Sequence, residues 1–126
     1  MADLTITQQF AQALQQKFIA AQEAKNAAIL EADPKAFVST AVYEFGVEQG
    51  SKYDRITQKR STDMYGGSVH AFVERSTGKL IKAAGWKAPA KRSNGELQSQ
   101  FNIGTAAGFK GALDAADLHG GYLYIR

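Results

Sequence analysis

The sequence predicts one α+β domain, in which a long N-terminal helix packs on a four- to five-stranded antiparallel sheet, with a short helix near the C-terminus. The chain of 126 residues has the usual length of a single domain. Its first part repeats apolar residues at helical spacing, and the later part alternates with the two-residue period of strands. We therefore assign residues 1–32 to the helix and residues 41–126 to the sheet region.

The long helix is predicted over residues 5–31 from its start signal and its apolar repeat. Thr5 and Gln8 have the spacing of a capping box, in which each side chain bonds the other residue's amide. The predicted buried stripe recurs every fourth position: Ile6, Phe10, Leu14 and Phe18. At ~1.5 Å per residue the helix is about 40 Å long. Because that is long for so small a domain, we expect part of it to overhang and pack against a second copy. Alternatively, it spans the whole sheet.

The strands are predicted from alternation between turn residues. Gly78 is placed for a positive φ in the hairpin turn of residues 76–79. Pro89 is expected to end pairing, because it has no amide to donate. The expected strands are residues 43–48, 52–60, 68–75, 79–87, 101–103 and 121–126.

Two shorter helical segments are also expected. Asp33 and Pro34 combine a good N-cap with a residue tolerated at the first helical position, so a helical turn is predicted through about Thr40. A second helix is predicted over residues 108–118, with Gly120 as its C-terminal stop.

Successive side chains of a strand point to opposite faces, which assigns the faces of the two central strands. In the second strand, one face is polar and basic and holds Tyr53, Arg55, Thr57 and Lys59. In the third strand, we expect Val69, Ala71 and Val73 on one face and His70, Phe72 and Glu74 on the other. One layer of helix covers one face of a sheet, so the other face is expected to meet water, a partner or a ligand.

The composition excludes several classes of site. The chain has no cysteine, which removes disulfides, thiol nucleophiles and cysteine-based metal sites. No apolar run approaches the ~18 residues of a membrane helix. The start, Met1-Ala2-Asp3, has no basic region before an apolar stretch, so no signal peptide and no membrane partner are expected. We expect the protein to stay in the cytoplasm of the cell that makes it.

Enzymatic chemistry is not expected. His70 lies in mid-strand without a nucleophile-elbow pattern nearby. Asp114, Asp117 and His119 are the best metal-like group, but their spacing does not share one helical face. The glycine-rich residues 104–111 lack the ending of a phosphate loop. We therefore predict no catalytic residue, no metal site and no cofactor.

Charge is unevenly distributed along the chain. Residues 1–50 hold three Lys or Arg and six Asp or Glu, whereas residues 51–100 hold ten and four. A basic segment favours an anionic partner, although a solvated charged face would look the same. Cations that neutralise phosphates, interleaved with rings that stack bases, are what single-strand binding requires. The candidate nucleic-acid-binding residues are Lys52, Tyr53, Arg55, Lys59, Arg75, Lys82, Trp86, Lys87, Lys91 and Arg92.

Residues 68–91 contain SVHAFV, TGK and KAAGWKAPAK, residues 52–56 read KYDRI, and the chain ends in GGYLYIR. These stretches are similar to small, uncharacterised bacteriophage proteins over about half of the chain. The resemblance implies a viral protein made in a bacterial cytoplasm. It does not include the N-terminal helix, and it implies no catalytic residue.

Two functions are therefore open. The first is non-enzymatic binding of single-stranded nucleic acid, DNA rather than RNA, by the basic sheet face of a homo-oligomer. The second is a protein–protein role, as a virion component or an inhibitor of a host enzyme, with the acidic helix as the working surface.

Overall fold

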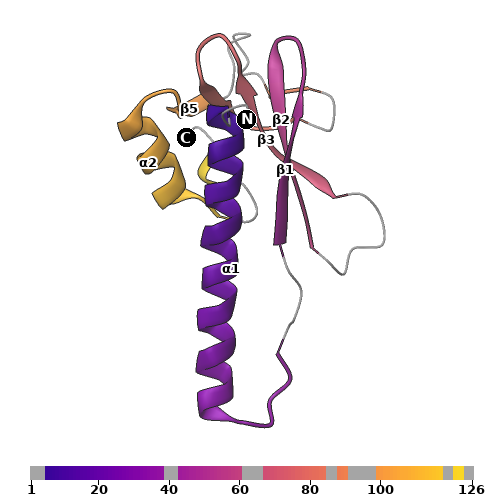
Figure 1. The fold of residues 1–126 in the computed structure, drawn as a ribbon, viewed down its shortest axis with the longest axis vertical. Coiled ribbons are helices and arrows are strands. Elements are labelled where there is room, and N and C mark those ends of the chain that lie inside the picture. The colour runs from indigo at the N-terminus through magenta and orange to yellow at the C-terminus, as the bar shows by residue number, and fades with distance from the viewer. Residues whose placement is uncertain are drawn as a thin grey trace.

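The structure, a computed structural model, describes residues 5–38, 43–60, 67–84, 88–90, 99–117 and 121–123. It confirms the α+β fold (Figure 1). The five strands form one antiparallel sheet in the order β1-β2-β3-β4-β5. In chain order the elements are α1 (Ile6–Ala32), β1 (Tyr43–Gln49), β2 (Tyr53–Arg60), β3 (Ser68–Glu74), β4 (Lys79–Ile81), β5 (Ser99–Asn102), α2 (Ala106–Ala115) and the 3-10 turn η1 (Gly121–Leu123).

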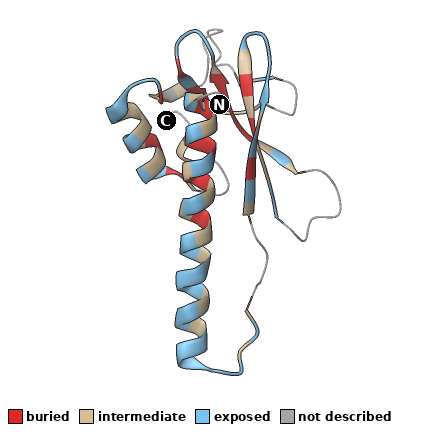
Figure 2. Cartoon of the chain, in the orientation of Figure 1, coloured by how far each residue is buried: buried red, intermediate tan, exposed pale blue. Residues whose placement is uncertain are grey.

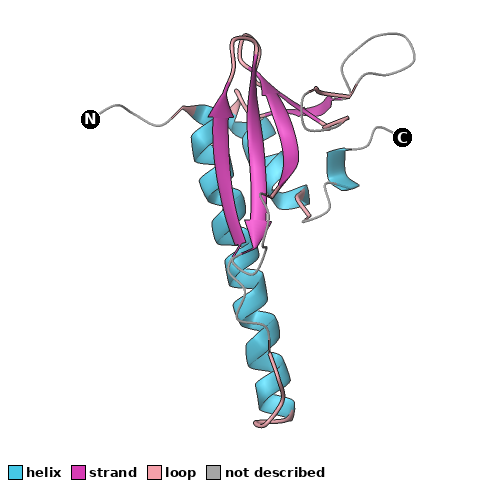
Figure 3. Cartoon of the chain, turned by 90° about the vertical axis from the view of Figure 1, so that its right-hand side faces the viewer, coloured by secondary structure: helices cyan, strands magenta, loops and turns pink. Residues whose placement is uncertain are grey.

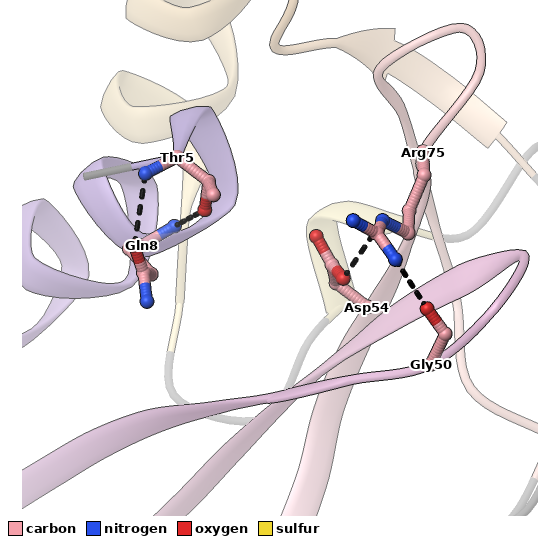
Figure 4. A network of polar contacts seen from close by, with 5 residues as sticks. All are labelled: Thr5, Gln8, Gly50, Asp54 and Arg75. Carbon is pink, nitrogen blue, oxygen red and sulfur yellow. Dashed lines mark hydrogen bonds and ion pairs between the residues drawn. The ribbon is translucent and has the colours of Figure 1, made fainter. Parts of the chain in front are cut away.

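Helix α1 begins as its sequence predicts. The Thr5 hydroxyl accepts from the Gln8 amide at 3.1 Å, and the Gln8 side chain accepts from the Thr5 amide at 2.9 Å (Figure 4). Phe10, Leu14 and Phe18 are buried as expected, but Ile6 is 38% exposed. A row of every fourth residue turns about 40° around the helix at each step, so three steps carry Ile6 away from the face that holds Phe18.

The second half of α1 extends past the sheet, as expected (Figures 1 and 2). Phe18 is its last buried residue. The helix ends at Asp33, whose amide still bonds the carbonyl of Ile29 at 2.9 Å. The helical turn that was predicted from Asp33 to about Thr40 is wrong, because the described residues 33–38 contain no helix. The amide of Ala36 bonds the carbonyl of Asp33 at 2.9 Å, which closes a single turn, and the chain then runs back beside α1.

One hydrophobic core lies between the two helices and one face of the sheet. Phe45, Ile56, Val73 and Leu80 come from the strands, and they pack with buried residues of α1 and with Ala112 of α2. Figure 1 shows both helices on this side of the sheet, which we call the inner face. The opposite, outer face therefore lies away from α1 and α2.

Lysine 17 ties the two helices together. Its ammonium donates to the carbonyls of Leu113 at 2.6 Å, Asp114 at 3.1 Å and Ala116 at 2.9 Å. These carbonyls lie at the end of α2, where helical partners run out and the helix dipole favours a cation. Helix α2 thus ends at Ala115 with Lys17 bonded to its last carbonyls. Gly120, where the sequence suggested the C-terminal stop, lies outside the described residues.

A β-bulge corrects one of the predicted faces. Ile56 pairs with Ala71, but the next residue, Thr57, pairs with Val69, so β3 has one extra residue at His70. An extra residue breaks the strict alternation of a strand. His70 consequently lies on the inner face against Phe45, with ring centroids 5.5 Å apart, rather than beside Phe72.

The C-terminal part of the sheet is shorter than expected. Strand β4 ends at Ile81, and between it and β5 the described residues pair at one isolated bridge, Ala83 with Pro89. The bonds around this bridge use the amides of Ala84 and Ala90, so Pro89 is paired at a position that needs no donor from it. In place of the last predicted strand, residues 121–123 form a 3-10 turn, and residues 124–126 lie outside the described part of the chain.

The glycine-rich segment before α2 has a structural role. Thr105 caps the helix, because its hydroxyl accepts from the Gly108 amide at 3.0 Å. A Cβ atom on Gly108 would lie 1.8 Å from the carbonyl oxygen of Asn102. The glycine therefore permits a close approach between α2 and β5, and Gly78 takes the predicted positive φ, 81°, in the hairpin turn.

Candidate functional site

The outer face holds the row of polar and basic side chains that the sequence placed on β2. Ile56 lies in the inner core, so its neighbours in the alternation, including Arg55 and Thr57, point outward. Figure 3 shows the strands in front of both helices, which leaves this side of the sheet uncovered by α1 and α2. We call Tyr53, Arg55, Thr57 and Lys59 the outer row.

Carboxylates of β1 stand opposite the cations of the outer row. Glu48 is the cross-strand partner of Arg55, and Glu44 is the partner of Lys59. Arg55 forms an ion pair with Glu48, and the Lys59 ammonium lies 3.8 Å from the Glu44 carboxylate. Both carboxylates are more than half exposed, so these are surface ion pairs, which contribute about 0–1 kcal/mol each to stability.

The rings of this face differ in how accessible they are. Phe72 pairs with Arg55 across the strands, and the guanidinium carbon lies 5.8 Å from the centre of its ring. Tyr53 meets the same ring edge to face, with centroids 6.3 Å apart. Phe72 is only 3% exposed beneath these two side chains, whereas Tyr53 is half-buried and has the Lys52 ammonium 5.4 Å from its ring centre. Tyr53 is therefore the ring of this group that can meet a ligand.

Two further predicted cations lie apart from the outer row. Arg75 donates to the carbonyl of Gly50 at 2.6 Å, and its Nε lies 3.6 Å from a carboxylate oxygen of buried Asp54 (Figure 4). That position joins the β1–β2 turn to the end of β3. Lys82 follows β4, and its ammonium donates to the carbonyl of Ala83 at 3.3 Å. Trp86, Lys87, Lys91 and Arg92 lie outside the described residues.

His70 takes part in a buried hydrogen-bond link. Its Nδ1 lies 2.6 Å from Oε1 of the Gln58 side chain, and its Nε2 lies 2.7 Å from the Tyr122 hydroxyl. The Gln58 oxygen only accepts, so Nδ1 donates to it. In the neutral ring that burial favours, Nε2 then accepts from the Tyr122 hydroxyl. Burial lowers the pKa of His70 to about 4, against an opposing effect of Asp117, and burial raises the pKa of Tyr122. The link attaches η1 to the bulge of β3.

Two of the three residues weighed as metal ligands, Asp114 and Asp117, bond other groups of the chain. The Asp114 carboxylate accepts from Lys110 at 2.7 Å, and the Asp117 carboxylate accepts from the Tyr122 amide at 3.2 Å. His119 lies outside the described residues. Among the residues that the structure describes, His, Asp and Glu form no group of three that could hold a metal ion. Neither α1 nor α2 is long and apolar enough to cross a membrane.

Three features of the structure were not anticipated from the sequence. They are the His70–Tyr122 link, the Lys17 cap and the exposure of Phe37, whose side chain is 97% accessible beside the overhanging end of α1. The His70–Tyr122 link joins residues that are 52 positions apart, and the Lys17 cap joins residues about 97 positions apart. A local sequence pattern cannot predict such contacts. Phe37 fell inside the helical turn that was predicted after Asp33.

The profile of a family described as a family of unknown function (DUF7717) matches residues 3–125. The chain belongs to this family. The match includes the N-terminal helix, which the resemblance to bacteriophage proteins left out, so it spans both the helix and the sheet of this chain. No curated protein and no solved structure matches the chain.

Proposed function

We propose that this protein is a non-enzymatic binding protein that takes single-stranded nucleic acid, DNA in preference to RNA, on the outer face of its sheet. The observation that carries the proposal is the outer row: a tyrosine and two cations at alternate positions of one strand, on a face that α1 and α2 leave uncovered. Lys52 adds a third cation beside Tyr53.

The carboxylates opposite the outer row set the expected strength of binding. A phosphate that approaches Arg55 or Lys59 replaces Glu48 or Glu44, at a cost of about 0–1 kcal/mol for each surface ion pair. Stacking of one base on Tyr53 contributes about 1–3 kcal/mol. We therefore expect binding that is modest and sensitive to salt.

The first test is a fluorescence-anisotropy titration of a labelled single strand of about 20 bases at about 50 and 200 mM salt. Contacts from Lys52, Arg55 and Lys59 give a slope of about −0.7 each in log affinity against log salt. Together they predict that affinity falls about 20-fold over this fourfold rise in salt. Absence of binding at the lower salt would contradict the proposal.

The second test removes the competing carboxylates. Glu44→Gln and Glu48→Gln free the two cations of the outer row, so each change should raise affinity about two- to fivefold, the equivalent of up to ~1 kcal/mol. Asp114→Asn on α2 makes the same change of charge at an exposed carboxylate that is likewise ion-paired, with Lys110 at 2.7 Å, and it serves as the control. Equal effects of all three variants would mean that only the overall charge matters.

Tyrosine 53 is tested separately from charge. Tyr53→Leu keeps an apolar cover over Phe72 but removes the ring that stacks a base, so affinity should fall at least fivefold with the salt slope unchanged. A variant that binds as tightly as the original protein would remove stacking from the proposal.

We also propose that the protein is encoded by a bacteriophage and acts in the cytoplasm of the bacterial host. The support is the similarity of residues 68–91 to small bacteriophage proteins. Sequencing around the gene should find it within a phage genome or an integrated prophage. Family members found only among chromosomal housekeeping genes would contradict this origin.

A second candidate is a protein–protein role without nucleic-acid binding, as a virion component or an inhibitor of a host enzyme. One observation favours it: Phe37, on the segment that returns from the overhanging end of α1, is almost completely exposed. In that case the carboxylate variants of β1 would leave any oligonucleotide signal at the level of the Asp114→Asn control.

A further inference from the structure

We propose that the overhanging end of α1, residues 19–32, and the segment that returns from it, residues 33–38, form a dimerisation surface whose partner is a second copy of this chain. We call these two segments the overhang surface. The inference is independent of nucleic-acid binding, because it rests on a different part of the molecule.

The overhang surface contains a groove of about 410 Å³. It lies between residues 18–29 of α1, the returning segment, Tyr43 at the start of β1 and Arg60 at the end of β2. Its lining is mixed. The apolar residues include Phe18, Ala21, Ile29, Val38 and Tyr43, and the polar residues are Gln22, Lys25, Asn26 and Arg60. On the helix, the half-buried lining positions 22, 26 and 29 are three or four residues apart, so they form one continuous face toward the groove.

A projecting ring stands beside this groove. Phe37 lines the groove and is 97% exposed, and Leu30 on the same end of α1 is 38% exposed. A single exposed apolar side chain is ordinary on a protein surface. Here the ring and a hollow able to receive a ring lie in one patch, which is what a two-fold contact between identical surfaces requires. In such a contact Phe37 of each copy enters the groove of the other.

The charges of the overhang surface also fit a second copy. The described residues that line the groove include Lys25 and Arg60 but no carboxylate. Glu31 and Asp33 lie at the end of α1, so a two-fold pairing can bring the acidic end of one copy to the basic groove of the other. Residues 19–38 hold three acidic and two basic residues, so two copies meet with little net repulsion.

The size of the surface sets the expected affinity. From Phe18 to Ala32, α1 extends about 21 Å at ~1.5 Å per residue. Such a surface buries less than the roughly 800 Å² per partner of a standard interface. We therefore expect a dimer with a dissociation constant in the micromolar range.

Sedimentation velocity without nucleic acid, from about 1 to 200 µM protein, tests the proposal; by the affinity arithmetic this range spans micromolar constants. Wild-type protein should pass from monomer to dimer. Phe37→Ser removes the projecting ring and Ala21→Arg fills the groove, so each should weaken dimerisation at least tenfold. Both side chains are exposed, and circular dichroism should give the same helix content for each variant as for the wild type.

Two matched controls locate the effect. Ala27→Arg makes the Ala21 substitution at another exposed position of α1 that does not line the groove. Ile6→Ser removes an exposed apolar side chain at the other end of the helix. Both controls should dimerise like the wild type. A protein that stays monomeric at 200 µM, a dimer that survives Phe37→Ser, or controls that weaken it equally would each overturn the proposal.

Discussion

Acidification should destabilise this protein through one buried histidine. His70 is enclosed by Phe45, Gln58 and Tyr122, and the lone pair on its Nε2 already accepts from the Tyr122 hydroxyl. A proton on Nε2 would remove that acceptor and place a charge in the core. Burial accordingly lowers the pKa of His70 from 6.5 to about 4.

The sign follows from proton binding in the two states. Between pH 6.5 and pH 4 the unfolded chain binds a proton at residue 70 and the folded chain does not, so stability falls as the pH falls through this window. The pKa difference, 6.5 − 4 = 2.5, corresponds to about 3 kcal/mol at ~1.36 kcal/mol per pKa unit. Lowering the pH from 7 to 5 crosses only part of this window, so the free energy of unfolding should fall by about 2 kcal/mol.

Urea unfolding at pH 7 and pH 5, followed by circular dichroism, measures this loss. The variant His70→Gln cannot take up the proton, so it should be less stable at pH 7 but lose about 2 kcal/mol less than the wild type on acidification. His119→Gln replaces the only other histidine in the chain. Because it leaves His70 in place, this variant should lose as much unfolding free energy between pH 7 and pH 5 as the wild type. Equal losses in the wild type and His70→Gln would refute the reasoning.

Further predictions concern α2 and are checked by urea unfolding at pH 7. Lys17→Met removes the ammonium that donates to three carbonyls at the end of α2, of which that of Leu113 keeps the Ala116 amide, and it should cost about 1–3 kcal/mol. Lys35→Met on the exposed returning segment should change stability by less than ~0.5 kcal/mol. Gly108→Ala places a methyl group against Asn102 and should cost about 1–3 kcal/mol. Gly111→Ala meets nothing within 4 Å and should stabilise α2 by about 0.5–1 kcal/mol. A Gly108→Ala variant as stable as Gly111→Ala would contradict the close approach of α2 to β5.

Several features that local sequence determines were predicted correctly, although the helical turn expected after Asp33 was not. The capping box of Thr5 and Gln8 begins α1 where expected, and Gly78 takes the left-handed conformation in its hairpin turn. The alternation of β2 also gave the right faces, because Ile56 is in the core and Arg55 lies against Phe72 on the other side. Each of these features depends on residues within a few positions of one another.

The errors arise where distant contacts decide the conformation. His70 was assigned to the wrong face, because a bulge leaves no mark in the alternation of apolar and polar residues. Residues 121–123 form a 3-10 turn rather than a strand, and Tyr122 there bonds His70 and Asp117. The candidate site was predicted as a set of cations and rings, but the sequence did not indicate that Glu44 and Glu48 face Lys59 and Arg55. Cross-strand register determines those pairs, and register follows from the whole sheet.

The most direct test of the proposed function is a map of backbone amide shifts when an unlabelled single strand of about 20 bases is added to ¹⁵N-labelled protein at about 50 mM salt, where phosphate contacts are least weakened. We predict that the shifts concentrate on β2 and on the turn that contains Lys52, and that they fade at about 200 mM salt. Shifts confined to α1, or none at the lower salt, would contradict the proposal that the outer face of the sheet binds nucleic acid.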